Sequence, residues 1–118
     1  MKTRSEYTCP LELTHDITKG KWKPIILWQL RKEAYSLSKL KASITGISQK
    51  MLIEQLQELQ SFDMIHREQN EGYPLKVSYS LSERGRKMLQ AIVIMQEIGV
   101  ELMLEDGRED FLRELGLL

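Results

Sequence analysis

The sequence predicts a mainly α-helical domain that carries one small β-hairpin. Two observations predict this α+β class. Around Gly46, two short helical segments meet in a tight turn, and in the second of them Leu52, Leu56 and Leu59 recur at the i, i+4, i+7 spacing of one helix face. After Phe62 the pattern changes to the alternation of a hairpin. A hairpin that directly follows two such helices is the winged helix-turn-helix arrangement.

The composition is that of a globular domain of ordinary size, so residues 1–118 are expected to form a single domain. No run of 18 apolar residues could cross a membrane, and residues 1–7 lack the apolar core of a signal peptide, so we expect a cytoplasmic protein without a membrane partner. Residues 1–96 hold 15 Lys and Arg against 10 Asp and Glu, whereas residues 97–118 hold 2 against 7. A basic body with an acidic end suggests that part of the surface meets a polyanion, although a solvated acidic helix end explains the same counts.

The chain begins with an arm and a short helix. Residues 1–8 are polar and predict a mobile arm. A helix is expected from Pro10, which suits a first turn because its missing N–H costs little there, to about residue 17. Leu11, Leu13 and Ile17 would form the buried side of this helix.

Two further helices precede the central turn. The segment from about residue 21 to about residue 32 is the most apolar so far and should be the central core helix. It contains Trp22 and Trp28, for which core packing is a simpler explanation than an aromatic ligand box. Ser36 can cap the next helix, expected over residues 37–43.

Ser48 is expected to cap the helix that follows the turn. While the leucines anchor one side, the other side carries Gln49, Lys50, Ile53, Glu54 and Gln57. Amide and ammonium donors on such a face suit the base edges and phosphates of a major groove. On this segment alone, an ordinary amphipathic surface helix is the alternative.

The hairpin is expected from two strands, residues 64–69 and 76–81, which flank a turn rich in turn-forming residues. One face of the second strand would carry Val77, Tyr79 and Leu81. Arg67, Tyr73 and Lys76 would lie near the tip or flanks of the hairpin.

A long helix follows, with Ser82 as its N-cap and an extent of residues 83–105. It holds far more apolar residues than one stripe facing a core requires. The surplus predicts a partner surface, because a large exposed apolar patch on a soluble protein marks an interaction site. A last short helix around Phe111 and Leu115 could wrap a second subunit.

Five short motifs occur in a characteristic order. They are Cys9-Pro10, Gly20-Lys21-Trp22, Gly46-Ile47-Ser48-Gln49-Lys50-Met51-Leu52, Pro74-Leu75-Lys76-Val77 and Tyr79-Ser80-Leu81-Ser82. With them the sequence resembles the HxlR family of small bacterial winged-helix transcription regulators, which are related in fold to the MarR group. The resemblance implies a homodimer formed through the terminal helices, residues 83–118. It also implies one wing and one recognition helix per subunit, and an operator with two-fold symmetry.

The sequence departs from the family pattern at three places. Ser36-Leu37 stands where the family usually has Arg-Phe, which removes a phosphate contact. The second wing strand reads Val77-Ser78-Tyr79 in place of Val-Glu-Tyr. A tryptophan often found late in the long helix is missing near Ile98-Gly99, which could mean a differently packed dimer interface.

These observations predict a dimeric transcription regulator, repressor or activator, that binds double-stranded DNA sequence-specifically. Basic side chains would neutralise phosphates, and the exposed face of the recognition helix would read bases, with glutamine favouring adenine and isoleucine able to touch a thymine methyl. The predicted DNA-binding residues are Lys39, Lys41, Ser48, Gln49, Lys50, Ile53, Glu54, Gln57, Arg67, Tyr73 and Lys76. A winged-helix module that binds proteins without specific DNA binding is the alternative.

Cys9 is the one candidate for chemistry. It lies at a predicted helix N-terminus, a position that favours the reactive thiolate, and the resemblance matches it to a cysteine that some members use as a redox or electrophile sensor. As the only cysteine it cannot form an intrachain disulfide. The alternatives are a buried, inert thiol and a response to a small ligand held near Trp22 and Trp28.

Neither a metal nor a cofactor is expected. His15 and His66 lie far apart in the sequence and no Cys-X-X-Cys or His-X-X-X-His spacing occurs. No catalytic triad, paired carboxylates or phosphate-binding loop is apparent, so we do not expect an enzyme.

Overall fold

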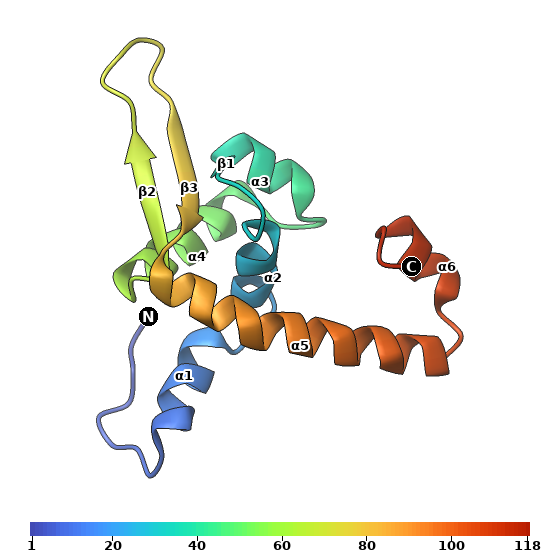
Figure 1. Cartoon of the computed structure of the whole chain (residues 1–118). Coiled ribbons are helices and arrows are strands. Elements are labelled where there is room, and N and C mark those ends of the chain that lie inside the picture. The colour runs from blue at the N-terminus through green and yellow to red at the C-terminus, as the bar shows by residue number, and fades with distance from the viewer.

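The computed structural model describes all 118 residues and contains six helices and three short strands (Figure 1). The elements are α1 (Pro10–Thr18), α2 (Trp22–Gln29), β1 (Tyr35–Ser36), α3 (Leu37–Ser43), α4 (Gln49–Ser61), β2 (Ile65–Gln69), β3 (Val77–Leu81), α5 (Glu83–Glu105) and α6 (Glu109–Glu114). The predicted fold class, a mainly helical winged helix-turn-helix with a small β-hairpin, is confirmed. Only α2 differs much in extent, because it ends at Gln29 rather than near residue 32.

The three strands form one antiparallel sheet in the order β1-β3-β2. The predicted hairpin is β2–β3, in which Ile65 pairs with Leu81 and Gln69 pairs with Val77. Strand β1 was not predicted; its Tyr35 pairs with Tyr79. Two residues are too few to show the alternation by which a strand is recognised in a sequence.

The core lies where α2, α4, the base of the hairpin and the first half of α5 meet. As predicted, Leu52, Leu56 and Leu59 of α4 are buried. The other core residues include Ile26, Leu27 and Leu30 of the α2 segment, Leu40, Ile65, Tyr79, Leu81 and Ile92. A core shared by all these elements fixes the hairpin beside α3 and α4.

The predicted buried side of α1 is wrong in part. Ile17 is buried, but Leu11 is 73% exposed and Leu13 is 37% exposed. Helix α1 lies at the edge of the body, and only its last turn reaches the core (Figure 1).

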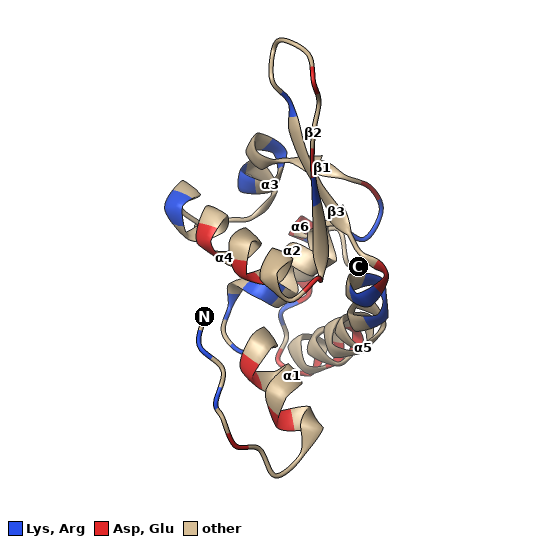
Figure 2. Cartoon of the chain, turned by 90° about the vertical axis from the view of Figure 1, so that its left-hand side faces the viewer, with Lys and Arg blue, Asp and Glu red and all other residues tan.

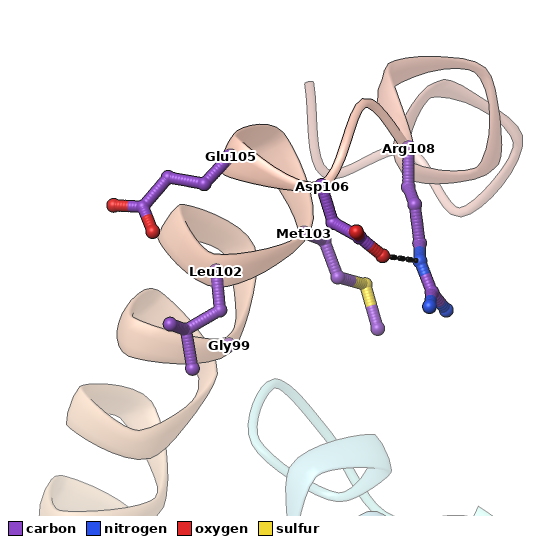
Figure 3. A pocket seen from close by; sticks show the side chains of 6 residues that line it. All are labelled: Gly99, Leu102, Met103, Glu105, Asp106 and Arg108. Carbon is purple, nitrogen blue, oxygen red and sulfur yellow. Dashed lines mark hydrogen bonds and ion pairs between the residues drawn. The ribbon is translucent and has the colours of Figure 1, made fainter.

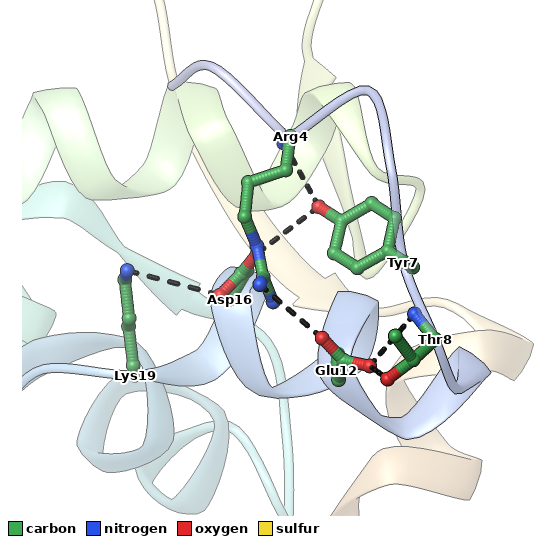
Figure 4. A network of polar contacts seen from close by, with 6 residues as sticks. All are labelled: Arg4, Tyr7, Thr8, Glu12, Asp16 and Lys19. Carbon is green, nitrogen blue, oxygen red and sulfur yellow. Dashed lines mark hydrogen bonds and ion pairs between the residues drawn. The ribbon is translucent and has the colours of Figure 1, made fainter.

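The N-terminal arm also differs from the mobile segment predicted. The Nε of Arg4 donates to Oδ2 of Asp16 at 2.8 Å, and the Tyr7 hydroxyl donates to the same oxygen at 3.0 Å (Figure 4). Arg4 also pairs with Glu12, at 3.2 Å. These bonds tie the arm to α1. They could not be predicted, because polar residues at these spacings have no characteristic pattern.

Three serine caps hold the helices that matter for the site. The hydroxyls of Ser36, Ser48 and Ser82 accept backbone N–H groups in the first turns of α3, α4 and α5, as predicted. Gly46 lies between α3 and α4 at φ +85°, a conformation that costs a glycine little. The cap and the glycine together set where α4 begins.

Beyond the body, α5 continues alone and ends in an elbow with α6 (Figure 1). Leu112 of α6 is buried at this elbow. No helix of the chain is both long enough and apolar enough to span a membrane.

Candidate nucleic-acid interface

Helix α4 presents to solvent the face that the sequence predicted for DNA. Gln49, Lys50, Glu54 and Gln57 are exposed, and Ile53 is half-buried beside them. The buried leucines on the opposite side hold this face outward. The face offers amide and ammonium donors at its start and a carboxylate one turn later, which is a pattern able to distinguish base edges.

Ser48 combines a structural contact with a free donor. Its hydroxyl oxygen accepts the N–H of Met51 at 3.1 Å, which caps α4. The hydroxyl hydrogen has no partner within the chain, so an exposed Ser48 can still donate to a phosphate.

The wing is a hairpin whose tip is fixed by one asparagine. The N–H of Asn70 donates to the carbonyl of Lys76 at 3.0 Å, and the N–H of Lys76 donates to Oδ1 of Asn70 at 2.6 Å. Beyond this closure Tyr73 is 99% exposed. Arg67, on β2, and Lys76, directly before β3, are also exposed. The wing therefore carries an exposed aromatic ring at its tip and two exposed cations.

A groove runs between α3, the start of α4 and the wing. It is lined by Ser36, Leu37, Ser38, Lys41, Ala42, Gln49, Leu75 and Val77. Of the predicted residues it brings together Lys41 and Gln49. Ser38 and Leu75 were not predicted as site residues, because they are far apart in the sequence and come together only when the wing folds back beside α3.

Lys39 is engaged within its own chain. Its Nζ donates to Oε1 of Glu33 at 2.7 Å and lies 4.2 Å from the centre of the Tyr35 ring. The hydrogen bond that Lys39 donates to Glu33 raises the pKa of Lys39 and lowers the pKa of Glu33. A phosphate would have to compete with Glu33 for this ammonium group.

Figure 2 shows Lys and Arg on α3, at the start of α4 and on the hairpin, with carboxylates further along α4 and on the hairpin; other basic groups lie on the N-terminal arm and at the start of α5. One of those carboxylates, Glu58, pairs with the buried Lys23 of α2, and this hydrogen bond lowers the pKa of Glu58. The pair offsets two charges between α2 and α4.

Cys9 is exposed and occupies the N-cap position of α1 without a side-chain cap bond. The alternative that Cys9 is a buried, inert thiol is therefore wrong for the single chain. Arg4, the nearest arginine in sequence, is bound to Asp16 and Glu12 (Figure 4).

The two tryptophans pack partly against the core. Trp22 lies under Lys21, whose Nζ is 4.5 Å from the ring centre, and Trp28 lies under the guanidinium of Arg31 at 4.0 Å. These contacts match the packing role expected for both rings.

The terminal elbow carries a shallow hollow and an apolar surface. Gly99, Leu102, Met103, Glu105, Asp106 and Arg108 line the hollow, and Asp106 pairs with Arg108 across it at 2.6 Å (Figure 3). The exposed large apolar residues of this region are Ile94, Met95, Ile98, Leu102, Leu104, Phe111, Leu115 and Leu118. The predicted surplus of apolar residues on the long helix is thus at the surface, where a partner could cover it.

Comparison with known proteins agrees with this geometry. The chain is 37% identical over 102 residues to MalR of Fusobacterium mortiferum, covering 86% of this chain and 96% of that protein. It is 41% identical over 91 residues to the uncharacterised HTH-type transcriptional regulator YdeP of Bacillus subtilis, covering 77% of this chain and 71% of that protein. The redox regulator HypR in its oxidized form superimposes with a TM-score of 0.75 at 35% identity, covering 79% of this chain and 96% of that one.

The family pattern covers the helix-turn-helix, the wing and all of α5. The HxlR-like helix-turn-helix matches residues 17–106. The resemblance inferred from the five motifs is therefore confirmed, and this chain belongs to the HxlR-like helix-turn-helix family of transcriptional regulators.

Proposed function

We propose that this chain regulates transcription in the cytoplasm as a homodimer that binds a two-fold symmetric DNA operator. The observation that carries the proposal is the donor-rich, exposed face of α4 beside a projecting wing. Two such helices must lie about 34 Å apart to enter successive major grooves on one side of the duplex. A dimer would supply this arrangement.

The apolar surface of α5 and α6 supports the dimer. Ile94, Met95, Ile98 and Leu102 are exposed on the part of α5 that extends beyond the body. Contiguous exposed apolar surface of this kind marks a protein interface in soluble proteins. The partner best suited to cover this apolar surface is α5 of a second copy of the chain, because a two-fold dimer brings the same patch of both subunits together.

Within the DNA complex, α4 would read bases and the basic groups would hold phosphates. Gln49 can pair with an adenine, Glu54 can accept from a cytosine, and Ile53 can contact a thymine methyl. Lys50, Arg67 and Lys76 would each release about one counterion, which steepens the dependence of affinity on salt.

An oxidant would act through Cys9. Its thiol is exposed at the start of α1, and HypR, a relative of 35% identity, is a redox regulator. Because the chain has one cysteine, oxidation leads to a mixed disulfide with a small thiol or to a Cys9–Cys9 bond across the dimer. Either product changes the N-terminal end of α1.

The test is DNA binding by the purified protein, with DNA taken from upstream of its own gene. We expect a specific, salt-dependent gel shift that Lys50→Gln weakens far more than Glu109→Gln, a charge change on α6. We also expect a thiol oxidant to change the affinity of the unaltered protein and not that of Cys9→Ser.

The outcomes separate the parts of the proposal. Binding that ignores the oxidant leaves the regulator intact and removes the role of Cys9. Binding no tighter to any sequence than to bulk DNA at physiological salt contradicts a sequence-specific regulator and favours a protein-interaction module.

A further inference from the structure

One lysine of the chain is buried. Lys23, in the first turn of α2, is 5% exposed and lies on the same side of that helix as the core residues Ile26 and Leu27. Its Nζ donates to a carboxylate oxygen of Glu58 in α4. The other oxygen of Glu58 is 3.6 Å from the N-terminal amino group, which is too long for a hydrogen bond. A buried ammonium group is costly without a partner, so the packing of α2 against α4 requires Glu58 at this position.

Stability alone does not account for a buried ion pair. Taking both charges out of water costs about as much as their attraction returns, and apolar side chains of similar size are often equally or more stabilising. What an ion pair adds is direction, because a charge-assisted hydrogen bond fixes two atoms relative to each other whereas apolar contacts are non-directional. The pair between α2 and α4 therefore constrains the geometry of α4 more than the stability of the fold.

The place of Glu58 on α4 shows which motion the pair opposes. Leu52, Leu56 and Leu59 attach α4 to the core along one stripe. At about 100° per residue, Glu58 lies about 120° around the helix axis from the centre of that stripe. Attachments on two sides of a helix resist rotation about its axis, which a single stripe of apolar contacts resists only weakly.

Rotation about the axis is also the motion that would disturb base reading most. Gln49 and Glu54 belong to the exposed face of α4, and base edges are read by hydrogen bonds that tolerate little misplacement. The other polar contacts of α4 hold its ends: Ser48 caps its start, and the Arg84 guanidinium donates to the carbonyl of Phe62 at 2.9 Å. The ion pair with α2 holds the side of the helix.

We propose that Lys23 and Glu58 are positioning residues for DNA recognition, because their ion pair sets the rotation of α4 about its axis and so aims the exposed face at base edges. In this role neither side chain contacts DNA. The inference rests on the proposed function. Loss of the pair should lower discrimination between sequences, whereas binding to phosphates, which depends on charge, should be retained.

The first experiment uses the double variant Lys23→Met, Glu58→Met. Methionine is unbranched and suits a helix, and the two changes together leave the net charge unaltered. Urea denaturation should show a stability equal to or above that of the unaltered protein. Affinity for the operator should fall about tenfold, as for one lost base contact, while affinity for a random duplex and its salt dependence stay the same. A folded double variant that discriminates as well as the unaltered protein overturns the proposal.

Two further variants separate positioning from packing. Ile92→Val shortens a core residue of α5, which lowers stability modestly, and it should leave the ratio of operator to random affinity unchanged. Glu58→Gln keeps an oxygen acceptor for Lys23 and should lose less of this ratio than Glu58→Met. If Ile92→Val lowers the ratio as much as the double variant does, or if the two changes at Glu58 are equivalent, the pair is not a positioning device.

The rotation of α4 can be measured without DNA. Residual dipolar couplings of backbone amides oscillate along a helix, and the phase of the oscillation reports rotation about the helix axis. In the double variant the phase along α4 should shift relative to that along α2. Identical couplings in the two proteins overturn the inference whatever the DNA result. If the unaltered protein binds no sequence better than bulk DNA, the proposed function fails, and the couplings still decide whether the ion pair orients α4.

Discussion

The two halves of α5 have similar amounts of apolar side chain and opposite surroundings. In the first half Ile92 is buried and Met88 and Leu89 pack against the core. In the second half Ile98 and Leu102 are exposed at 49% and 59%. The first half meets α2 and β3, whereas the second half meets only α6 (Figure 1).

The difference shows that the apolar content of a helix does not decide whether it belongs to a core or to an interface. The first half is fixed by the rest of its own chain. The second half has the same kind of surface without an intrachain partner, so its stability as a folded element depends on association. Substitutions placed in matched positions of the two halves can separate these cases.

The largest effect is expected at the close approach of the first half to the wing. A Cβ on Gly85 would lie 2.0 Å from the carbonyl oxygen of Met64. Gly85→Ala should therefore lower the free energy of unfolding by about 3 kcal/mol, because a backbone group must move. The measurement is urea denaturation followed by circular dichroism.

Gly99→Ala is the matched change in the second half. Nothing lies within 4 Å of a Cβ at Gly99 in the single chain, so the stability of the monomer should rise by up to about 1 kcal/mol through helix propensity. If Gly99→Ala instead weakens the dimer, a partner helix approaches closely there. Equal losses for the two glycines in dilute, monomeric protein would contradict the comparison.

The second largest effect is expected on association. Ile98→Glu places a charge in the exposed apolar face of the second half, and we expect the dimer dissociation constant to rise by about 100-fold or more, since an unpaired buried charge costs several kcal/mol. The measurement is sedimentation equilibrium. Gln90→Glu adds the same charge at an exposed position of the first half, and should leave the dissociation constant unchanged.

The third prediction concerns the two ends of α5. The buried Ser82 hydroxyl donates to the carbonyl of Asp63 at 2.6 Å and accepts the N–H of Gly85 at 3.0 Å. Ser82→Ala should cost about 2 kcal/mol of global stability, because the Asp63 carbonyl and the Gly85 N–H both lose a partner.

At the C-terminal end of α5, Gly107→Ala strains a residue at φ +73°. It should melt α6 alone, which hydrogen exchange would show as local loss of protection.

Most of the fold could be predicted because its elements depend on local signals. The bounds of α3 and α5 follow from the serines that cap them, and the buried side of α4 follows from the spacing of three leucines. The errors lie where tertiary contacts decide. The exposure of Leu11 depends on where α1 sits at the edge of the body, and β1 exists only because β3 lies beside it.

The candidate site divides in the same way. The face of α4 could be predicted since it is the complement of the buried leucines. The groove beside it could not, because Ser38 and Leu75 are far apart in the sequence. The pairing of Lys39 with Glu33 could not be predicted either, because two residues six positions apart across a turn form no characteristic pattern.

The smallest expected effect concerns a helix that is held by charge rather than by apolar packing. Asp16 of α1 accepts hydrogen bonds from Arg4 and Tyr7, and the bond from Arg4 is the main reason that its pKa is lowered (Figure 4). A carboxylate with a lowered folded-state pKa stabilises the fold above its unfolded pKa, about 3.9, and this contribution is lost as the pH falls through the folded value.

Stability should therefore change little between pH 7 and about pH 5 on account of Asp16 and should fall in more acidic solution. Glu12, whose pKa is lowered chiefly by its hydrogen bond from Thr8, contributes with the same sign, so Asp16→Asn is needed to isolate one group. That variant should be slightly less stable than the unaltered protein at pH 7 and should lose less on acidification, as measured by urea midpoints at pH 7, 5 and 3. If the two proteins lose the same stability on acidification, the arm is not anchored through Asp16. Each element of this chain would then be held by apolar packing alone, either in the core or, like the second half of α5, against a partner.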